Sequence, residues 1–302
     1  MNYGTAILEG FKYLLSNYPE TFVIGQGLWS PWYVGNTMSD LDKIFGKSRV
    51  IDTPVSEAAV TGAAVGASLN EMKPIVVHPR MDFMMYAMDP IINQAAKWSY
   101  MFGGQSSPSI TIRGIINRGG EQGAQHSQAL HSLFAHIPGL KVVLPSSVAD
   151  ARDLLIASVL AEQPVIYIDD RWCYEHEQEE TPIIEKQLSE IRPKVLNRGD
   201  DITIVSSSYG ILLALEASKD LKESGIFSEV IDLRIISPLY IDTIMKSVKK
   251  TGKLLVIDGG WMRFGLSGEI IASVAEKYQF ESGPPKRITI SNAPAPTSKP
   301  LE

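Results

Sequence analysis

The chain has 302 residues, with 28 Lys and Arg against 34 Asp and Glu, a net charge of −6, and 44% hydrophobic residues. Because it has no basic block and no apolar run of membrane-spanning length, we expect neither a nucleic-acid partner nor membrane insertion. The single cysteine, Cys173, excludes an internal disulfide framework and no signal-peptide pattern is evident, so we expect a cytoplasmic protein of about two domains.

The first half of the chain alternates strand and helix patterns. Short continuous apolar runs indicate buried strands, and apolar residues at helical spacing indicate helices. The predicted strands are 21–27, 48–54, 73–79, 109–115, 140–147 and 164–170. The predicted helices are 4–17, 39–46, 58–70, 84–101, 126–139 and 148–163. This alternation predicts an α/β domain with a mostly parallel sheet.

A polar, acid-rich segment then interrupts the pattern. We expect a linker at 179–193, which separates a first domain at 1–178 from a smaller α/β domain at 194–302. Gly225 and Gly252 suit the left-handed position that ends a helix. In the second domain we predict strands at 201–210, 228–236, 253–261 and 287–293 and helices at 211–225, 237–252 and 265–279.

Glu57 stands at the mouth of the 58–70 helix. This helix has almost no polar face, and Gly62 and Gly66 lie four apart among alanines, so we expect it to be buried with another backbone close by. A carboxyl group there is costly to bury unless something uses it. Burial would raise its pKa, and the helix N-terminus would oppose that rise. Spacing alone gives equal weight to a residue that only caps its helix or pairs with an arginine.

His126 lies in the glycine-rich segment 119–128, between a predicted buried strand and a helix. Such loops are typical of functional sites, and a histidine there could donate to a substrate carboxylate or oxyanion. A capping histidine without chemistry is an equal alternative. His126, His131 and His136 recur every five residues, which places them on different faces of a helix, so we expect no metal triad.

An apolar cluster opens the predicted 84–101 helix, formed by Phe83, Met84, Met85, Tyr86 and Met88. Its spacing favours core packing, as is usual for Met-rich runs. The alternative is an aromatic wall for a flat ring. The segments 259–260 and 265–268 contain glycines but not in the strand-GxGxxG-helix order, so they give little support for a phosphate-binding site.

Five motifs occur in a fixed order: DTPVSE at 52–57, DPIINQAAK at 89–97, GAQHSQ at 123–128, PGLKVV at 138–143, and GGW at 259–261 with FG at 264–265. With these motifs the chain resembles, over nearly its whole length, the β subunit of the thiamine-diphosphate-dependent 2-oxoacid dehydrogenase component of the pyruvate dehydrogenase type, which is related to the C-terminal half of transketolase. The resemblance implies two stacked α/β domains, a pyrimidine-binding domain and a transketolase C-terminal-like domain.

The resemblance also implies roles for three residues. Glu57 matches the catalytic glutamate that hydrogen-bonds a ring nitrogen of the cofactor's aminopyrimidine. Phe83 matches the aromatic residue that stacks on that ring, and His126 matches the histidine that contacts substrate or intermediates. The implied reaction is decarboxylation of a 2-oxoacid and transfer of the acyl or aldehyde unit, for which the cofactor carries the chemistry.

A partner chain follows from the same resemblance. The family holds the cofactor's diphosphate through Mg²⁺ with a GDG…N motif on a separate α subunit, and this chain has no such motif. We therefore expect an α2β2 heterotetramer, activity only with the α subunit, and no Mg²⁺ site on this chain. Whether a lipoyl-bearing acyltransferase also binds stays open. The helix with Gly62 and Gly66 is a candidate interface element; the alternative is packing within its own domain.

Several positions depart from the family pattern. Gln26 replaces an acidic residue associated with proton communication between paired active sites; it can hydrogen-bond but cannot carry a proton in the same way. His78 and Arg80 lie in the altered segment 77–82 and, with Gln125, are candidate contacts for an unusual anionic substrate; the alternative for the first two is a surface position. The family's structural K⁺ is expected near Ile110, Ser158, Ala161 and Gln163, with Ala161 in place of an acidic residue.

Three functions therefore stay open from the sequence. The first is the β subunit of a 2-oxoacid dehydrogenase, which Glu57, Phe83 and His126 favour. The second keeps the cofactor in a transketolase-like or acyloin-forming ligase, which the altered segment 77–82 allows. The third is a non-catalytic scaffold subunit, suggested by Gln26 and by the same segment.

Overall fold

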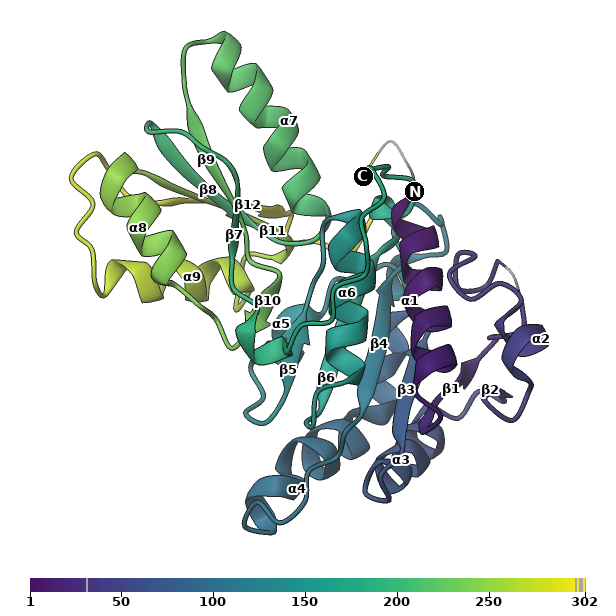
Figure 1. Ribbon diagram of the computed structural model, residues 1–302. Coiled ribbons are helices and arrows are strands. Elements are labelled where there is room, and N and C mark those ends of the chain that lie inside the picture. The colour runs from purple at the N-terminus through teal and green to yellow at the C-terminus, as the bar shows by residue number, and fades with distance from the viewer. Residues whose placement is uncertain (31, 297, 299–300, 302) are drawn as a thin grey trace.

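The computed structural model describes residues 1–30, 32–296, 298 and 301. Two sheets organise the chain, with the first domain on the right of Figure 1 and the second at upper left. The N-terminus and the last described residues lie close together in that view. No helix in the described part of the chain has the length and apolar character needed to cross a membrane. The predicted α/β class is confirmed.

The first sheet has seven strands in the order β10-β5-β6-β4-β3-β1-β2. Its neighbours are parallel except for β10, which runs antiparallel to β5. The strands are β1 (Thr21–Gln26), β2 (Val50–Thr53), β3 (Lys73–His78), β4 (Thr111–Ile116), β5 (Lys141–Val143), β6 (Val165–Asp170) and β10 (Ile235–Ser237). The carboxyl ends of the parallel strands therefore meet at one edge of the sheet.

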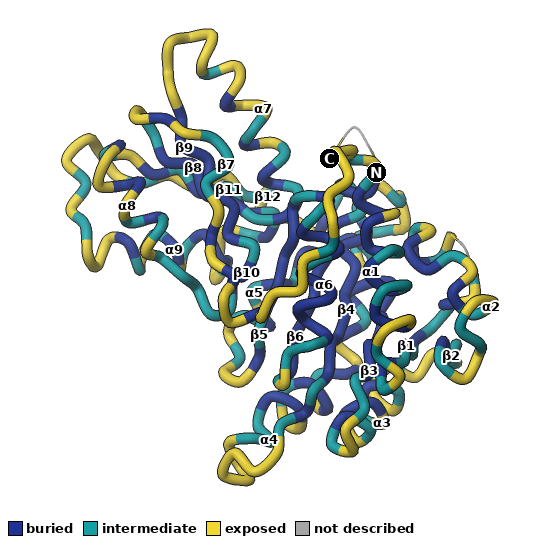
Figure 2. The backbone as a smooth tube through the Cα atoms, viewed as in Figure 1, coloured by how far each residue is buried: buried dark blue, intermediate teal, exposed yellow. Residues whose placement is uncertain are grey.

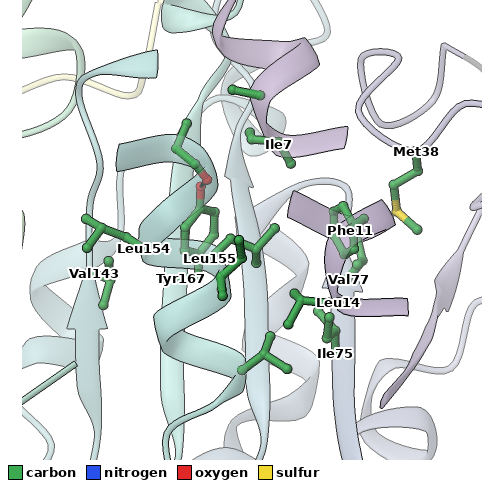
Figure 3. Packing of buried hydrophobic residues seen from close by; sticks show 14 of the residues in the cluster. Ile7, Phe11, Leu14, Met38, Ile75, Val77, Val143, Leu154, Leu155 and Tyr167 are labelled. Carbon is green, nitrogen blue, oxygen red and sulfur yellow. Dashed lines mark hydrogen bonds between the residues drawn. The ribbon is translucent and has the colours of Figure 1, made fainter. Parts of the chain in front are cut away.

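Helices cover both faces of this sheet. α1 (Tyr3–Asn17) and α6 (Val148–Val159) lie side by side on one face, and α3 (Glu57–Ser68), α4 (Ala96–Met101) and α5 (His131–Ala135) belong to the other. Side chains of β3 alternate between the two, because Ile75 and Val77 pack with α1 and α6 whereas Val76 packs with α3. Figure 3 shows Phe11 and Leu14 of α1 beside Val77 and Ile75 of β3. The short α2 (Leu41–Phe45) lies near β2 at the edge.

The second sheet has five strands in the order β12-β11-β8-β9-β7. They are β7 (Lys194–Asn197), β8 (Ile202–Ser206), β9 (Ser228–Asp232), β11 (Leu254–Trp261) and β12 (Lys286–Ile290), with helices α7 (Tyr209–Glu223), α8 (Asp242–Thr251) and α9 (Leu266–Ala275). Gly252 ends α8 with φ 70°, as predicted. The division into 1–178, 179–193 and 194–302 stays a prediction, and residues 297, 299–300 and 302 of its last part lie outside the described residues.

Two predicted strand features were wrong in detail. The run at 228–236 is two strands, and its second part, β10, leaves the second sheet to pair with β5 of the first. β7 was missed because it has only four residues and directly follows the polar, acid-rich segment; it lies at the edge of its sheet, where it pairs antiparallel with β9. β10 lets the second domain contribute directly to the first sheet.

Two predicted long helices were also wrong. The 84–101 segment is a 3-10 helix over Met81–Ala87, a π-helix over Asp89–Ala95 and then α4; Pro90, which has no N–H to donate, stands where the pattern changes. The 126–139 segment contains only α5 after a 3-10 turn over Ala124–His126. Between them the N–H of Gln128 donates to Asp82 Oδ1 at 3.1 Å instead of to a helical carbonyl.

The expectation that α3 is buried on all sides was wrong for this chain. Its buried residues form one stripe: Thr61, Ala64, Val65 and Ser68. On the opposite face Ala59, Ala63 and Gly66 are exposed, as is Ala58 in the first turn, and a side chain at Gly66 would meet nothing within 4 Å. Figure 2 shows the exposed segments of α3 at the lower end of the first domain. The small residues therefore create a smooth exposed face rather than a close contact inside the domain.

A buried ion pair joins the two central strands of the first sheet. Arg113 of β4 and Asp169 of β6 are both fully buried, and Arg113 Nε and Nη2 donate to the two carboxylate oxygens at 2.8 Å each. Thr37 Oγ1 accepts a third hydrogen bond from Arg113, and the Tyr174 hydroxyl donates to Asp169. Although burial opposes the charge, Asp169 raises the pKa of Arg113. The pair is therefore satisfied on both sides.

Removal of one partner should be costly, because it leaves a buried charge without compensation. We expect Asp169→Ala to lower the free energy of unfolding by about 3–5 kcal/mol, measured by urea unfolding. The control is Glu9→Ala, which breaks the exposed Glu9–Lys12 pair and should cost less than about 1 kcal/mol. Equal effects of the two substitutions would contradict this account.

Candidate functional site

One pocket lies at the carboxyl edge of the first sheet, where β1, β2 and β3 end. Its lining includes four predicted site residues, Glu57, His78, Arg80 and Phe83. The other lining residues are Gly25, Gln26, Tyr33, Thr53, Pro54, Ser56, Val60, Val76, Val77 and Pro79. The carboxyl edge of a parallel sheet is where ligands bind in open α/β folds.

Glu57 is the first residue of α3 and is half-buried. Within the described residues its carboxylate forms no ion pair and no hydrogen bond, so neither a capping role nor a pair with an arginine accounts for it. The carboxylate is thus available to a ligand in the pocket.

Phe83 and His126 come together although 43 positions separate them in the sequence. Their rings meet edge to face, with centroids 5.1 Å apart, and Tyr86 stacks at 6.4 Å on Phe83. The core packing that spacing alone favoured for the 83–88 cluster is confirmed for Met84, which is fully buried, but was wrong for the half-buried Phe83. His126 Nδ1 is buried without a hydrogen-bond partner in the described part of the chain. An orphaned buried nitrogen beside an aromatic ring is typical of a ligand contact.

His78 is buried at the end of β3, so a surface position is wrong for it. Its Nε2 lies 3.4 Å from the Thr61 hydroxyl of α3. Burial lowers the pKa of His78 from 6.5 to about 4, because the imidazolium would lose its hydration. His78 is therefore a neutral group of the pocket at neutral pH.

Arg80 is also buried rather than at the surface, with only 7% exposure. Its Nε and Nη2 donate to Gln122 Oε1 at 2.9 and 2.8 Å, and its Nη1 donates to the carbonyl oxygens of Tyr33 and Pro79. The guanidinium also lies 5.2 Å from the centre of the Tyr33 ring. All of these partners are uncharged.

The sequence did not single out Tyr33, which lines the pocket, or Asp82, which lies next to the predicted site residue Phe83. Tyr33 accepts a hydrogen bond at its hydroxyl from Gln26 Nε2 at 3.0 Å, which gives Gln26 a local partner. Asp82 is buried and holds Gln128 by two hydrogen bonds, of 3.1 Å to its N–H and 2.9 Å to its side chain. Burial raises the pKa of Asp82 despite these bonds. The position of Asp82 just after a predicted strand was the available signal.

The remaining predicted residues lie apart from the pocket. Gln125 is exposed on the 3-10 turn beside His126. Ser158 Oγ donates to the carbonyl of Leu154, and Ile110 is buried before β4. Ala161 and Gln163 are half-buried just after α6. Among the described residues no three His, Cys, Asp or Glu side chains gather as a metal site would require.

Comparison with known proteins shows the family. Residues 1–174 match the transketolase pyrimidine binding domain and residues 192–302 match the transketolase C-terminal domain. The chain is 39% identical over 284 residues to the pyruvate dehydrogenase E1 component subunit beta of Rickettsia bellii, which covers 94% of this chain and 87% of that relative. The chain belongs to the family of pyruvate dehydrogenase E1 β subunits. The resemblance seen in the sequence is confirmed.

Other similar proteins carry names other than pyruvate dehydrogenase. The acetoin:2,6-dichlorophenolindophenol oxidoreductase subunit beta of Bacillus subtilis is 39% identical over 259 residues, which is 85% of this chain and 75% of that relative. A solved split-gene transketolase, described as an inactive beta4 tetramer, superposes with a TM-score of 0.78 at 22% identity and covers 97% of this chain and 89% of that one. The latter shows the fold, which agrees with the two transketolase-like domains expected.

Because His78 stays unprotonated in the folded protein, it makes stability depend on pH. In the unfolded chain this histidine is protonated below about pH 6.5, whereas in the folded protein it is protonated only below about pH 4. The free energy of unfolding therefore falls as the pH falls from 6.5 to 4. We expect His78→Gln to remove about 3 kcal/mol of this decline, measured by urea unfolding at several pH values. His136→Gln, at an exposed position, is the control. An unchanged slope in His78→Gln would refute the assignment.

Proposed function

We propose that the chain is the β subunit of a two-chain thiamine-diphosphate-dependent enzyme that decarboxylates a 2-oxoacid and transfers the acyl or aldehyde unit. The observation that supports it most is the meeting of Glu57 and Phe83 in one pocket, with His126 against Phe83. The three residues come from three segments, at 57, 83 and 126. A scaffold has no physical need for an unpaired half-buried carboxylate beside an aromatic ring.

The pocket residues suit the aminopyrimidine of thiamine diphosphate. Glu57 offers a carboxylate that has no protein partner among the described residues, and it can hold a proton at a ring nitrogen. The Phe83 ring suits a flat heterocycle. When bound, thiamine diphosphate supplies the electron sink for loss of carbon dioxide, and the protein orients and tunes it.

His126 is the proposed residue that contacts the substrate. Its unpartnered Nδ1 can accept or donate one hydrogen bond, depending on the tautomer. His78 stays neutral, and Arg80 provides a fixed positive charge in the same pocket. Gln125, exposed beside His126, is a further proposed contact. Asp82 holds the histidine segment in place through Gln128.

The proposed partner is an α subunit that carries the diphosphate and Mg²⁺ site, in an α2β2 heterotetramer. The absence of a GDG…N motif from the sequence supports it, as does the exposed small-residue face of α3. K⁺ near Ile110, Ser158, Ala161 and Gln163 and a lipoyl-bearing acyltransferase partner belong to the same proposal, on the resemblance alone. The cytoplasmic location expected from the sequence is also part of it.

A second candidate function is cleavage or formation of an acyloin. The relative in Bacillus subtilis, named for acetoin, favours it. The two functions use the same pocket and differ in the donor. Comparison of acetoin with 2-oxoacids as donors for the reconstituted enzyme separates them. A complex that turns over neither donor would favour a scaffold.

We expect Glu57→Gln to lower turnover of the complex at least about 100-fold, because an amide cannot share a proton with the ring nitrogen as a carboxyl group does. Steady-state kinetics with a GDG…N-bearing α chain measures this, and size-exclusion chromatography shows that assembly is intact. Thiamine diphosphate should bind weakly to the β chain alone and tightly to the complex.

The matched control is Glu71→Gln, an exposed carboxylate just beyond the other end of α3. It should assemble and turn over like the native complex. Normal turnover in Glu57→Gln would remove Glu57 from the mechanism.

A further inference from the structure

Two guanidinium groups converge beside the pocket. Arg80 follows β3, and Arg171 follows β6. Arg80 Nη1 and Arg171 Nη2 donate to the same carbonyl oxygen, that of Tyr33, at 3.2 and 3.0 Å. Both groups therefore lie within a few ångströms of one atom, and the two positive charges are close neighbours.

Neither charge is neutralised within the described residues. The arginines that form ion pairs there are Arg113, Arg118, Arg152 and Arg234. The carboxylates next to Arg171 in sequence are engaged elsewhere, since Asp169 binds Arg113 and Asp170 lies 3.6 Å from Arg118. Asp82 attracts Arg80 only at longer range, and burial, followed by repulsion from Arg171, lowers the pKa of Arg80.

This arrangement is costly for the protein alone. A buried charge without a counter-ion loses hydration that carbonyl groups and one amide replace only in part. Arg171 Nε is a second indication that a ligand is missing, because this nitrogen is buried and has no hydrogen-bond partner in the described part of the chain. Two adjacent cations and an orphaned donor together suit an anion that accepts several N–H groups.

The reacting carboxylate of a 2-oxoacid is a poor occupant. That group loses its negative charge as carbon dioxide departs, so cations that hold it would stabilise the ground state more than the transition state. A permanent anion elsewhere on the substrate is held equally in both states and carries no such penalty. Arg80 shares the pocket with Glu57 and Phe83, so such an anion would belong to the same substrate.

We propose that Arg80 and Arg171 form a subsite for a second anionic group, so that the donor is a 2-oxoacid with a carboxylate or phosphate at its far end. This inference rests on the proposed function. Gln122 fixes Arg80 and the Tyr33 carbonyl joins the two arginines, so both are preorganised for the anion.

Matched donors test the subsite in the reconstituted complex. 2-Oxoglutarate and 2-oxopentanoate have the same chain length, as do oxaloacetate and 2-oxobutanoate, and only the first of each pair has a second carboxylate. We expect kcat/KM to favour the dianion by about tenfold or more in at least one pair. A preference for the monoanion in both pairs would overturn the proposal.

Arg80→Gln and Arg171→Gln should each lower the ratio of dianion to monoanion kcat/KM by at least about tenfold, since each removes one charge-assisted contact. Arg171 is only half-buried, so its variant tests the subsite even if Arg80→Gln does not fold. Arg198→Gln, at an exposed position far along the chain, is the control and should keep the native ratio. Native ratios in both pocket variants would refute the subsite.

A binding measurement separates this inference from the proposed function. Glutarate and inorganic phosphate lack the oxo group and should raise the melting temperature of the native complex, and the rise should vanish in Arg171→Gln. The stronger of the two identifies the second group as a carboxylate or a phosphate. Suppose the complex is inactive on every donor, but anions raise its melting temperature and Arg171→Gln abolishes that rise. The proposed decarboxylase function would then be refuted, and the anion subsite would be supported. If neither anion raises the melting temperature, the subsite is wrong whatever the activity.

Discussion

The candidate site depends on the parallel pairing of β1, β3, β4 and β6, which brings four segments to one edge of the sheet. Close packing of β1 on β3 requires Gly25, where a Cβ would lie 2.3 Å from the Val77 carbonyl oxygen. The segments that leave this edge provide Gln26, His78, the loop with His126, and Arg171. Residues remote in sequence thus lie in or beside one pocket because the strands are parallel and in register.

Buried arginines occur in two different electrostatic settings in this sheet. Arg113 meets both oxygens of Asp169 and is fully satisfied, as expected of a group that holds strands together. Arg80, two residues beyond β3, has only neutral acceptors and a second arginine beside it. In low-dielectric surroundings the Arg113–Asp169 pair holds two strands together, because each charge has its counter-ion. In the same surroundings the charge of Arg80 lacks a counter-ion and depends on a ligand to supply one.

Much of this arrangement was predictable from sequence, since the apolar runs located every strand of the first sheet before β10 and the resemblance selected Glu57, Phe83 and His126. The helix at 84–101 and the one at 126–139 failed because Pro90 and the hydrogen bonds of Asp82 to Gln128 override local periodicity. Arg171 was missed because its partner, the Tyr33 carbonyl, lies on a loop that no pattern connects to β6. Strand ends indicate which edge a residue reaches, but not which neighbours it meets there.

The exposed face of α3 connects the site to assembly. Glu57 begins the helix whose outer face carries Ala59, Ala63 and Gly66, with Ala58 also exposed in the first turn, and small side chains let another backbone approach closely at little entropic cost. A partner on this face would cover the half-buried carboxylate of Glu57 and strengthen every electrostatic contact that it makes. Under the proposed function, the α subunit would then do more than hold the diphosphate, because its docking would also set the dielectric surroundings in which Glu57 contacts the ring nitrogen.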